Sequence, residues 1–461
     1  MVFSSLTFIF VFLPLALALY YAVPFRAKTL VILIASYVFY AWWRVDFLIL
    51  IAAMSVFTYG MAHIALNAPR ESQRRLALTA GIVVDLGLLG YFKYAMFFGG
   101  NLSVLSQGIT GQGFDIPDII LPIGISFHTF QSISYLIDIY RKDARPARTV
   151  FDFMAFGALF PQLIAGPVLR YKDIADQFEY REHSYELFAR GIYRFALGLG
   201  MKVLIADSVA PIADAVFGMS APTMAESWLG TAAYSIQLLF DFMGYSSMAI
   251  GLGLMMGFRI MENFDAPYRS RSITEFWRRW HISLSSWLRD YLYIPLGGNR
   301  KGPRRTYINL MLTMILGGLW HGAAWTFILW GLWHGGLLAL ERALGWQNGK
   351  SLLRWGMALV LVMLGWTLFR AVTLPDALAM YAGMIGLNGL SLTADVAWQI
   401  TPLALTMLVV GWTLALTPVK EIFAAAQQRA VMRNAIATTL FIVAVSRLAA
   451  SSYSPFLYFQ F

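Results

Sequence analysis

The chain alternates long apolar runs with short basic clusters from end to end. Ten of the runs are close to the ~20 residues that a helix needs to cross ~30 Å of hydrocarbon. They lie at 5–24, 29–43, 47–66, 77–98, 119–138, 187–209, 227–257, 355–372, 397–418 and 434–452. This pattern predicts an all-α, polytopic membrane protein with about ten spans, built as one integral-membrane domain over residues 1–461.

The positions of Lys and Arg orient these spans, because cytoplasmic loops carry an excess of both residues. Basic clusters lie at Arg26–Lys28, Arg70–Arg75, Arg141–Arg148, Arg259–Arg305, Arg342–Arg354 and Lys420–Arg433. Neither residue occurs in Gly99–Pro117, Ala206–Gly257 or Ala371–Pro418. We expect the clusters inside, and the connecting parts of the other three segments and both termini outside. The first run, Leu6–Val23, has no signal-peptide pattern and is interpreted as a retained span.

Two apolar segments do not fit a simple crossing. Phe151–Leu169 has basic residues on both flanks, and Pro161 and Pro167 interrupt any helix within it. Ile308–Leu340 has basic flanks as well and is too long for one span. Irregular backbone at membrane depth is tolerated only where protein or a water-filled cavity covers it. Both segments are therefore predicted to be re-entrant or broken.

Composition narrows the possible chemistry. The chain is 59% hydrophobic, which no soluble domain of this size can bury, and its net charge of +10 follows from cytoplasmic loops without any need for nucleic acid. Because it has no cysteine, a thiol nucleophile and a disulfide framework are excluded. We find no metal-ligand spacing, no phosphate-binding glycine loop and no nucleophile-elbow motif.

The stretch Phe276–Gly298 has two unlike sides if it is read as one helix. Its apolar arc consists of Trp277, Trp280, Leu284, Trp287, Leu288 and Tyr291, and the opposite side carries Arg278, Arg279, Ser286 and Arg289. This predicts an amphipathic helix in the plane of the membrane interface, with His281 at the edge of its apolar side. Residues 269–305 carry nine Lys or Arg against two Asp or Glu. Lipid anchoring explains such a surface, and so does attraction of a polyanionic donor such as coenzyme A or an acidic carrier protein.

The pentapeptide GLWHG occurs twice, and each copy places a histidine in a stretch without charged residues. Intramembrane ionisable residues are costly, so His321 and His334 should face protein or a wet cavity. On a continuous helix the two rings would point roughly 220° apart, so only one could line a given cavity unless the helix breaks. For His334 we favour a hydrogen bond between helices. His128 and Asp241 are further polar residues within spans, where a pathway and an interhelical bond both remain open.

Two long blocks carry a family resemblance. The sequence NFDAPYRSRSITEFWRRWHISLSSWLRDYLYIPLGGNRKG, followed by LGGLWHGAAWTFILWGLWHG, resembles the membrane-bound O-acyltransferase superfamily, and most closely its alginate O-acetylase branch. The resemblance covers the whole chain, including FPQLIAGPVLR and DFMGYSSMAIGLGLMMGF. Met243, Ser247 and Ala324 depart from the residues common in that branch, which puts substrate contacts in doubt but leaves acyl transfer intact.

The resemblance implies a helical protein in which a funnel on one side of the membrane and a narrow passage to the other side meet near a histidine in mid-membrane. It identifies His321 as the essential histidine and His281 as its companion near the cytoplasmic mouth. Expected substrate contacts are Arg278, Arg279, Arg289, Trp320, Trp325 and Asp241. We expect no metal and no cofactor, with acetyl-CoA as the donor substrate.

The resulting hypothesis is transfer of acetyl groups across a bacterial inner membrane for O-acetylation of an exopolysaccharide such as alginate or cellulose. Its partners would be a periplasmic acetyltransferase and a polysaccharide-secretion complex, with the membrane lipids around it. Three alternatives stay open at this point: D-alanyl transfer from a carrier protein to teichoic acid, a transporter or flippase, and a structural subunit. A transporter should show paired internal repeats, and the chain has none beyond GLWHG.

Overall fold

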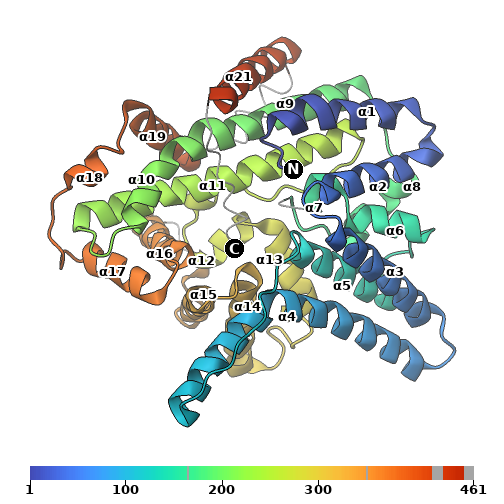
Figure 1. Ribbon diagram of the computed structural model, residues 1–461, viewed down its shortest axis with the longest axis horizontal. Helices are drawn as coiled ribbons and strands as arrows, with labels where there is room; N and C mark the ends of the chain where they lie inside the picture. The colour runs from blue at the N-terminus through green and yellow to red at the C-terminus, as the bar shows by residue number, and fades with distance from the viewer. Residues whose placement is uncertain (164–165, 349–350, 418–428, 451–461) are drawn as a thin grey trace. The chain divides into compact units, whose positions relative to one another are not determined.

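Helices form every regular element in the described part of the chain, which comprises residues 1–163, 166–348, 351–417 and 429–450 of a computed structural model (Figure 1). The chain divides into two compact units. The first unit contains Met1–Phe188 and Gly253–Ile260, and the second contains Ala189–Leu252 and Met261–Phe461. The predicted all-helical class is confirmed.

The first unit packs its longest helices side by side. Its elements are η1 (Phe8–Phe12), α1 (Leu13–Ala22), α2 (Phe25–Ala41), α3 (Asp46–Asn67), α4 (Glu71–Thr110), α5 (Ile125–Arg141), α6 (Val150–Gly157), α7 (Phe160–Leu163) and α8 (Tyr171–Glu179). Helices α3, α4 and α5 lie against one another. Gly81 on α4 permits this approach, because a Cβ there would lie 2.8 Å from Cδ1 of Leu136 on α5.

The second unit holds the elements that form the candidate site. It begins within α9 (Tyr185–Gly200) and continues through η2 (Met201–Ala206), α10 (Asp207–Phe217) and α11 (Met224–Met255). The short elements η3 (Pro267–Arg269), α12 (Ile273–Arg279), α13 (Ile282–Leu288) and η4 (Arg289–Tyr293) follow. The rest are α14 (Gly302–His321), α15 (Trp325–Ala343), η5 (Trp346–Asn348), α16 (Leu352–Arg370), α17 (Leu374–Met384), α18 (Ala394–Ala397), α19 (Pro402–Leu416) and α21 (Ala430–Ala450).

Each apolar run contains a helix, although the runs at 119–138 and 397–418 become continuously helical only from Ile125 and Pro402. By length and composition alone, six helices of the described residues could cross a membrane, namely Asp46–Asn67, Glu71–Thr110, Tyr185–Phe217, Met224–Met255, Leu352–Arg370 and Ala430–Ala450. Phe8–Ala22 and Pro402–Leu416 are shorter apolar helices. The count of about ten crossings therefore stays a prediction. The last predicted spans end at residues 418 and 452, and both of these residues, with Phe461, lie outside the described part.

Both irregular apolar segments are broken, as the sequence predicts. Phe151–Leu169 contains α6 from its second residue onward and all of α7, and residues 164–165 within it are not described. Ile308–Leu340 is divided at residues 322–324 into most of α14 and most of α15.

One long helix and one predicted amphipathic helix differ clearly from the prediction. Helix α4 does not end near residue 98 but continues to Thr110, which makes it 40 residues or about 60 Å long. The single amphipathic helix predicted over Phe276–Gly298 is wrong. The chain there forms α12 and α13, and His281 between them has a left-handed backbone with φ 45° and ψ 53°. A local turn of this kind leaves no mark on the spacing of apolar residues, so the pattern could not predict it.

Candidate active site

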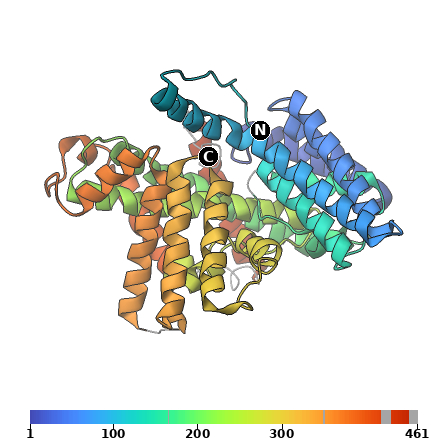
Figure 2. The ribbon, with the colours of Figure 1, turned by 90° about the horizontal axis from the view of Figure 1, so that it is seen from below.

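The two GLWHG copies lie where α14 packs against α15. Helix α15 also packs against α16 (Figure 2). A Cβ on Gly318 would lie 2.2 Å from the carbonyl oxygen of Phe327 and 3.4 Å from Cα of Gly331. A Cβ on Gly331 would lie 2.4 Å from the carbonyl oxygen of Met314. The first glycine of each copy therefore lets the two backbones touch, and the repeat has a packing reason independent of its histidines.

His321 is the last residue of α14, at the point where the hairpin turns. Its side chain is 8% exposed and sits among aromatic rings. The ring centroids of Trp320, Phe369 and Trp330 lie 5.0, 5.1 and 5.3 Å from that of His321. At this break in the hairpin, His321 lies in the wall of a pocket.

That pocket, here called the histidine pocket, has a volume of about 530 Å³. His321, Gly317 and Trp330 contribute to its wall along with Trp277, Leu284, Leu288 and Met314. Its other lining residues include Arg278, Arg289, Arg342, Tyr293, Asn299 and Gln347. No carboxylate occurs among the described residues that line it. Arg289 is paired with the neighbouring Asp290 at 2.6 Å, but the pocket as a whole favours an anionic ligand.

His334 takes a different position in the same hairpin. Its ring is fully buried, stacks on Phe276 at 6.2 Å and meets Trp277 and Trp330 edge-on at 5.2 and 5.1 Å. Neither ring nitrogen has a hydrogen-bond partner among the residues that the structure describes. The hydrogen bond between helices that we favoured for His334 is therefore not found. The ring packs as part of an aromatic cluster with Phe276, Trp277 and Trp330.

His281 lies close to His321 although it comes from the turn between α12 and α13. The two ring centroids are 6.3 Å apart, and Phe242 meets His281 edge-on at 4.7 Å. Nδ1 of His281 is 3.2 Å from Oδ1 of Asn263. Complete burial lowers the pKa of His281 to about 3, because the charged ring would lose its hydration, so the imidazole is neutral at physiological pH.

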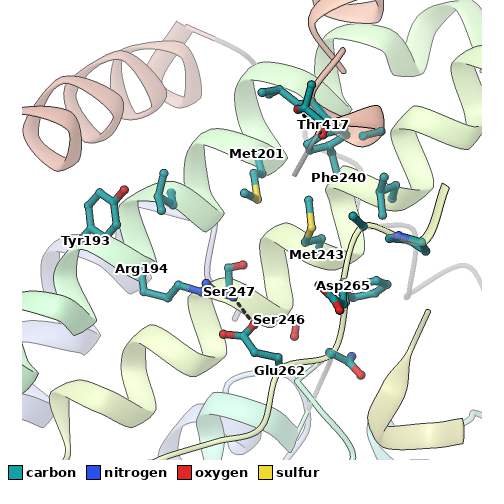
Figure 3. Close-up of a pocket in the computed structure, with 18 residues that line it drawn as sticks. Tyr193, Arg194, Met201, Phe240, Met243, Ser246, Ser247, Glu262, Asp265 and Thr417 are labelled. Atoms are coloured by element: carbon teal, nitrogen blue, oxygen red, sulfur yellow. Dashed lines mark hydrogen bonds and ion pairs between the residues drawn. The ribbon is translucent and has the colours of Figure 1, made fainter. Parts of the chain in front are cut away.

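A second pocket of about 240 Å³, here called the methionine pocket, lies between η2, α11, the loop before α12 and the end of α19 (Figure 3). Met201, Met243, Ser246 and Ser247 line it, and an ion pair of 2.5 Å joins Arg194 to Glu262 in its wall. Met243 and Ser247 are two of the positions that depart from the related branch, so the structure gathers both departures in one pocket. Asn263 lines it as well.

The other predicted contacts divide into two groups. Arg278 and Arg289 line the histidine pocket, and Trp320 is buried beside both histidines. Arg279 does not line that pocket: it pairs with Glu275 at 2.9 Å and donates to the carbonyl oxygen of Asp265. Trp325 is 55% exposed and is absent from the lining of both pockets.

Polar residues within the predicted spans bind other helices. Asp241 on α11 pairs at 2.8 Å with Lys202 on η2, and Lys202 also pairs with Asp207. In the first unit, His128 places Nδ1 3.2 Å from the carbonyl oxygen of Gly157. These contacts favour the interhelical reading of both residues over a role in a pathway.

Sequence reasoning missed two residues of the site. Arg342 lies near the end of α15, inside a basic cluster that was used only to orient the chain. A break in Ile308–Leu340 makes the segment a helical hairpin, with His321 on its first arm and Arg342 on its second. That arrangement could have indicated Arg342 as a residue of the site. Asn263 lies in a loop without periodicity, and nothing in the pattern distinguishes it from other loop asparagines.

The assembled residues suit acyl transfer better than metal or nucleophile-triad chemistry. A neutral imidazole can accept a proton from a hydroxyl, and a cationic pocket beside it can hold an anionic donor. No group of three or more His, Cys, Asp or Glu side chains that could hold a metal ion occurs among the described residues.

Comparison with known proteins agrees with this chemistry. The profile of the membrane-bound O-acyltransferase family matches residues 148–355, which include both histidines of the site. The protein named probable alginate O-acetylase AlgI of Azotobacter vinelandii is 50% identical over the full length of both chains, and that of Pseudomonas aeruginosa is 47% identical, also over both full lengths. The peptidoglycan O-acetyltransferase of Helicobacter pylori is 36% identical over 85% of this chain and 81% of its own.

Proposed function

Because the chain belongs to the membrane-bound O-acyltransferase family, we propose that it passes acetyl groups from acetyl-CoA across the bacterial inner membrane for O-acetylation of an exopolysaccharide. That it is an acyltransferase follows from the family and from relatives named O-acetylases and O-acetyltransferase. The donor, the direction of transfer and the acceptor are the proposal. The names of the relatives support alginate as a candidate acceptor, and cellulose is a second.

The observation that carries the proposal is the lining of the histidine pocket. Arg278, Arg289 and Arg342 share this pocket with His321, the family's expected base. Coenzyme A carries several phosphate charges, whereas its thioester end is small and neutral. A pocket with arginines at some of its walls and an imidazole at another matches a donor of this charge distribution.

The reaction that we infer needs no group beyond donor, acceptor and histidine. A hydroxyl oxygen of the acceptor bonds to the thioester carbonyl carbon, while His321 accepts the hydroxyl proton as general base. When the tetrahedral intermediate collapses, the carbon–sulfur bond breaks and the imidazolium returns the proton to the leaving thiolate. General-base catalysis of this kind commonly contributes about 10²–10⁴-fold to the rate.

The sides of the membrane follow from the distribution of Lys and Arg. Arg278, Arg289 and Arg342 belong to basic clusters that we place on the cytoplasmic side, where coenzyme A thioesters are found. The acetyl group would leave on the outer side, either directly to the polysaccharide or to a periplasmic acetyltransferase within a secretion complex.

Replacement of His321 tests this function. His321→Ala should abolish the release of free thiol from acetyl-CoA by the purified protein and the acetylation of the cell's exopolysaccharide, at unchanged membrane abundance. His63→Ala, on α3 in the first unit, is the matched control and should behave as wild type. Wild-type acetylation by a well-expressed His321→Ala variant would refute the role of His321. A wild-type protein that consumes no acetyl-CoA in any assay would instead favour a carrier-protein donor or a transporter.

A further inference from the structure

Three hydrogen-bond contacts converge on one oxygen atom of a loop asparagine. The side-chain Oδ1 of Asn263 accepts from the backbone N–H of Ser283 at 3.1 Å and from Oγ of Ser283 at 2.8 Å. Nδ1 of His281 lies 3.2 Å from the same oxygen. Asn263 and His281 are almost completely buried, so none of these contacts is shared with bulk water.

The chemistry of these partners determines the protonation of His281. A backbone N–H can only donate, so the asparagine atom that faces Ser283 must be the carbonyl oxygen and not the amide nitrogen. An amide oxygen can only accept, so Nδ1 of His281 must carry the proton. In a neutral ring the other nitrogen, Nε2, then keeps its lone pair. Nε2 is buried and has no hydrogen-bond partner among the described residues.

We propose that Asn263 is a positioning residue that holds His281, which lies behind the pocket lining, as the Nδ1–H tautomer, so that an uncharged ring with a lone pair on Nε2 stands next to His321 during acyl transfer. The inference rests on the proposed acyl transfer, because it gives His281 a role in that reaction. The separation of the two rings supports it, since their centroids lie 6.3 Å apart at the end of α14.

The backbone around Asn263 serves the same arrangement. The carbonyl oxygen of Asn263 accepts from the N–H of Ile282 at 3.0 Å, and the N–H of Asp265 donates to the carbonyl oxygen of Arg279 at 3.0 Å. These bonds attach the loop to both sides of His281. The left-handed backbone of His281 is sparsely populated and costs on the order of 1–3 kcal/mol, so it persists only where the surroundings hold it. Asn263 provides both a side-chain and a main-chain contact for that purpose.

Replacement of Asn263 by aspartate separates positioning from simple packing. Asn263→Asp has the same shape and can accept the same three hydrogen bonds, but its carboxylate stabilises the charged form of His281. The pKa of His281 should therefore rise, and a proton should occupy Nε2 at a higher pH than in the wild type. Activity should fall as the pH falls through the new pKa, so the acidic limb of the pH–rate profile moves to higher pH.

A second variant removes the contact altogether. Asn263→Leu should lower kcat roughly 10- to 100-fold, as loss of a group that orients a functional histidine commonly does, with the donor KM changed less than about twofold. Asn388→Leu makes the same change at an asparagine that lines neither pocket and is the control. Its kcat and pH profile should match the wild type.

A measurement independent of activity completes the test. In protein with ¹⁵N-labelled histidine, the His281 signals are identified by their loss in His281→Gln, and their titration reports tautomer and pKa. We expect an Nδ1–H ring in the wild type and a raised pKa in Asn263→Asp. Unchanged titration and an unchanged pH profile in Asn263→Asp, or wild-type kcat in Asn263→Leu, would overturn the proposal. If the wild-type protein consumed no acetyl-CoA, the proposed function would fail, and the titration would still decide the role of Asn263.

Discussion

Gly318 and Gly331, the first residues of the two GLWHG copies, meet where α14 packs against α15. A Cβ on Gly318 would lie within 3.4 Å of Cα of Gly331, and closer still to the backbone of Phe327. Because the obstacles are backbone atoms and not flexible side chains, this contact has little room to adapt. The position of His321, three residues further along α14, depends on it.

Adding one methyl group at Gly318 should therefore disrupt the hairpin. We expect Gly318→Ala to lower the free energy of unfolding by about 1–3 kcal/mol or more, and to reduce acetyl transfer with it. Gly336→Ala on α15 is the matched control, because nothing lies within 4 Å of its added Cβ. Thermal unfolding of the purified variants measures the difference. Equal stability of the two variants would contradict the contact.

His334 should tolerate an apolar replacement. Its two ring nitrogens have no partner among the described residues, so His334→Leu removes buried polar atoms without breaking a hydrogen bond. We expect unchanged or higher thermal stability and at least half of the wild-type acetyl transfer. A well-folded His334→Leu protein without activity would show that this ring takes part in the chemistry.

Arginines of the histidine pocket should matter for the donor. Arg278→Ala and Arg342→Ala should each raise the KM for acetyl-CoA by about tenfold, the effect of losing one charge-assisted hydrogen bond of about 1.5 kcal/mol. The dependence of that KM on salt should flatten. Arg304→Ala removes the same charge from an exposed residue outside the pocket and is the control. Arg279 is unsuitable for this test because it holds Glu275 and the carbonyl oxygen of Asp265. Unchanged KM in both pocket variants would mean that the donor enters elsewhere.

The buried cluster of Lys202, Asp207 and Asp241 should respond asymmetrically to mutation. Lys202→Met leaves two carboxylates without their shared cation, and we expect it to lower the free energy of unfolding by about 3–5 kcal/mol. Asp241→Asn leaves the pair of Lys202 and Asp207 in place and should be less destabilising, by about 1 kcal/mol. Adding Asp241→Asn to Lys202→Met should recover part of the loss. If Asp241→Asn were more destabilising than Lys202→Met, Asp241 itself, and not its ion pair with Lys202, would be the group that stabilises the fold.

The assignment of membrane sides is open to a direct test, since the native chain has no cysteine to give background labelling. A cysteine at Arg300 should be protected from an impermeant thiol reagent in spheroplasts and become reactive after permeabilisation. A cysteine at Gln112 should react without permeabilisation. Both positions are exposed, so burial does not confuse the result. Labelling of Arg300→Cys in intact spheroplasts would place the histidine pocket's arginines on the outer side.

The spacing of apolar residues was sufficient to predict much of the helical framework. Length and basic flanks predict that Ile308–Leu340 is re-entrant or broken, but they do not locate the break, which the structure places at residues 322–324. The same spacing failed over Phe276–Gly298, because a helix broken by one left-handed residue keeps its apolar side chains at nearly helical intervals. Local hydrogen bonds to Asn263 decide that turn, and they come from a loop before α12.

Among the site residues, too, some could be predicted from the sequence and others could not. His321 and Arg278 could be proposed from the sequence because each belongs to a conspicuous motif. The pairing of Asp241 with Lys202, by contrast, joins residues on different helices and could not be inferred from one sequence. The contrast between Arg279 and Arg342 has the same origin: which arginine faces the pocket depends on where α12 ends and how α15 packs.

The left-handed turn at His281 also limits which residues could replace it over evolution. Besides glycine, asparagine, aspartate and histidine are the residues that enter this region of backbone space most readily. Each of the three has a short polar side chain that can hydrogen-bond at the same place. The backbone therefore favours glycine and a small set of hydrogen-bonding groups at position 281, and a change within that set would alter the proton chemistry there without rebuilding the fold.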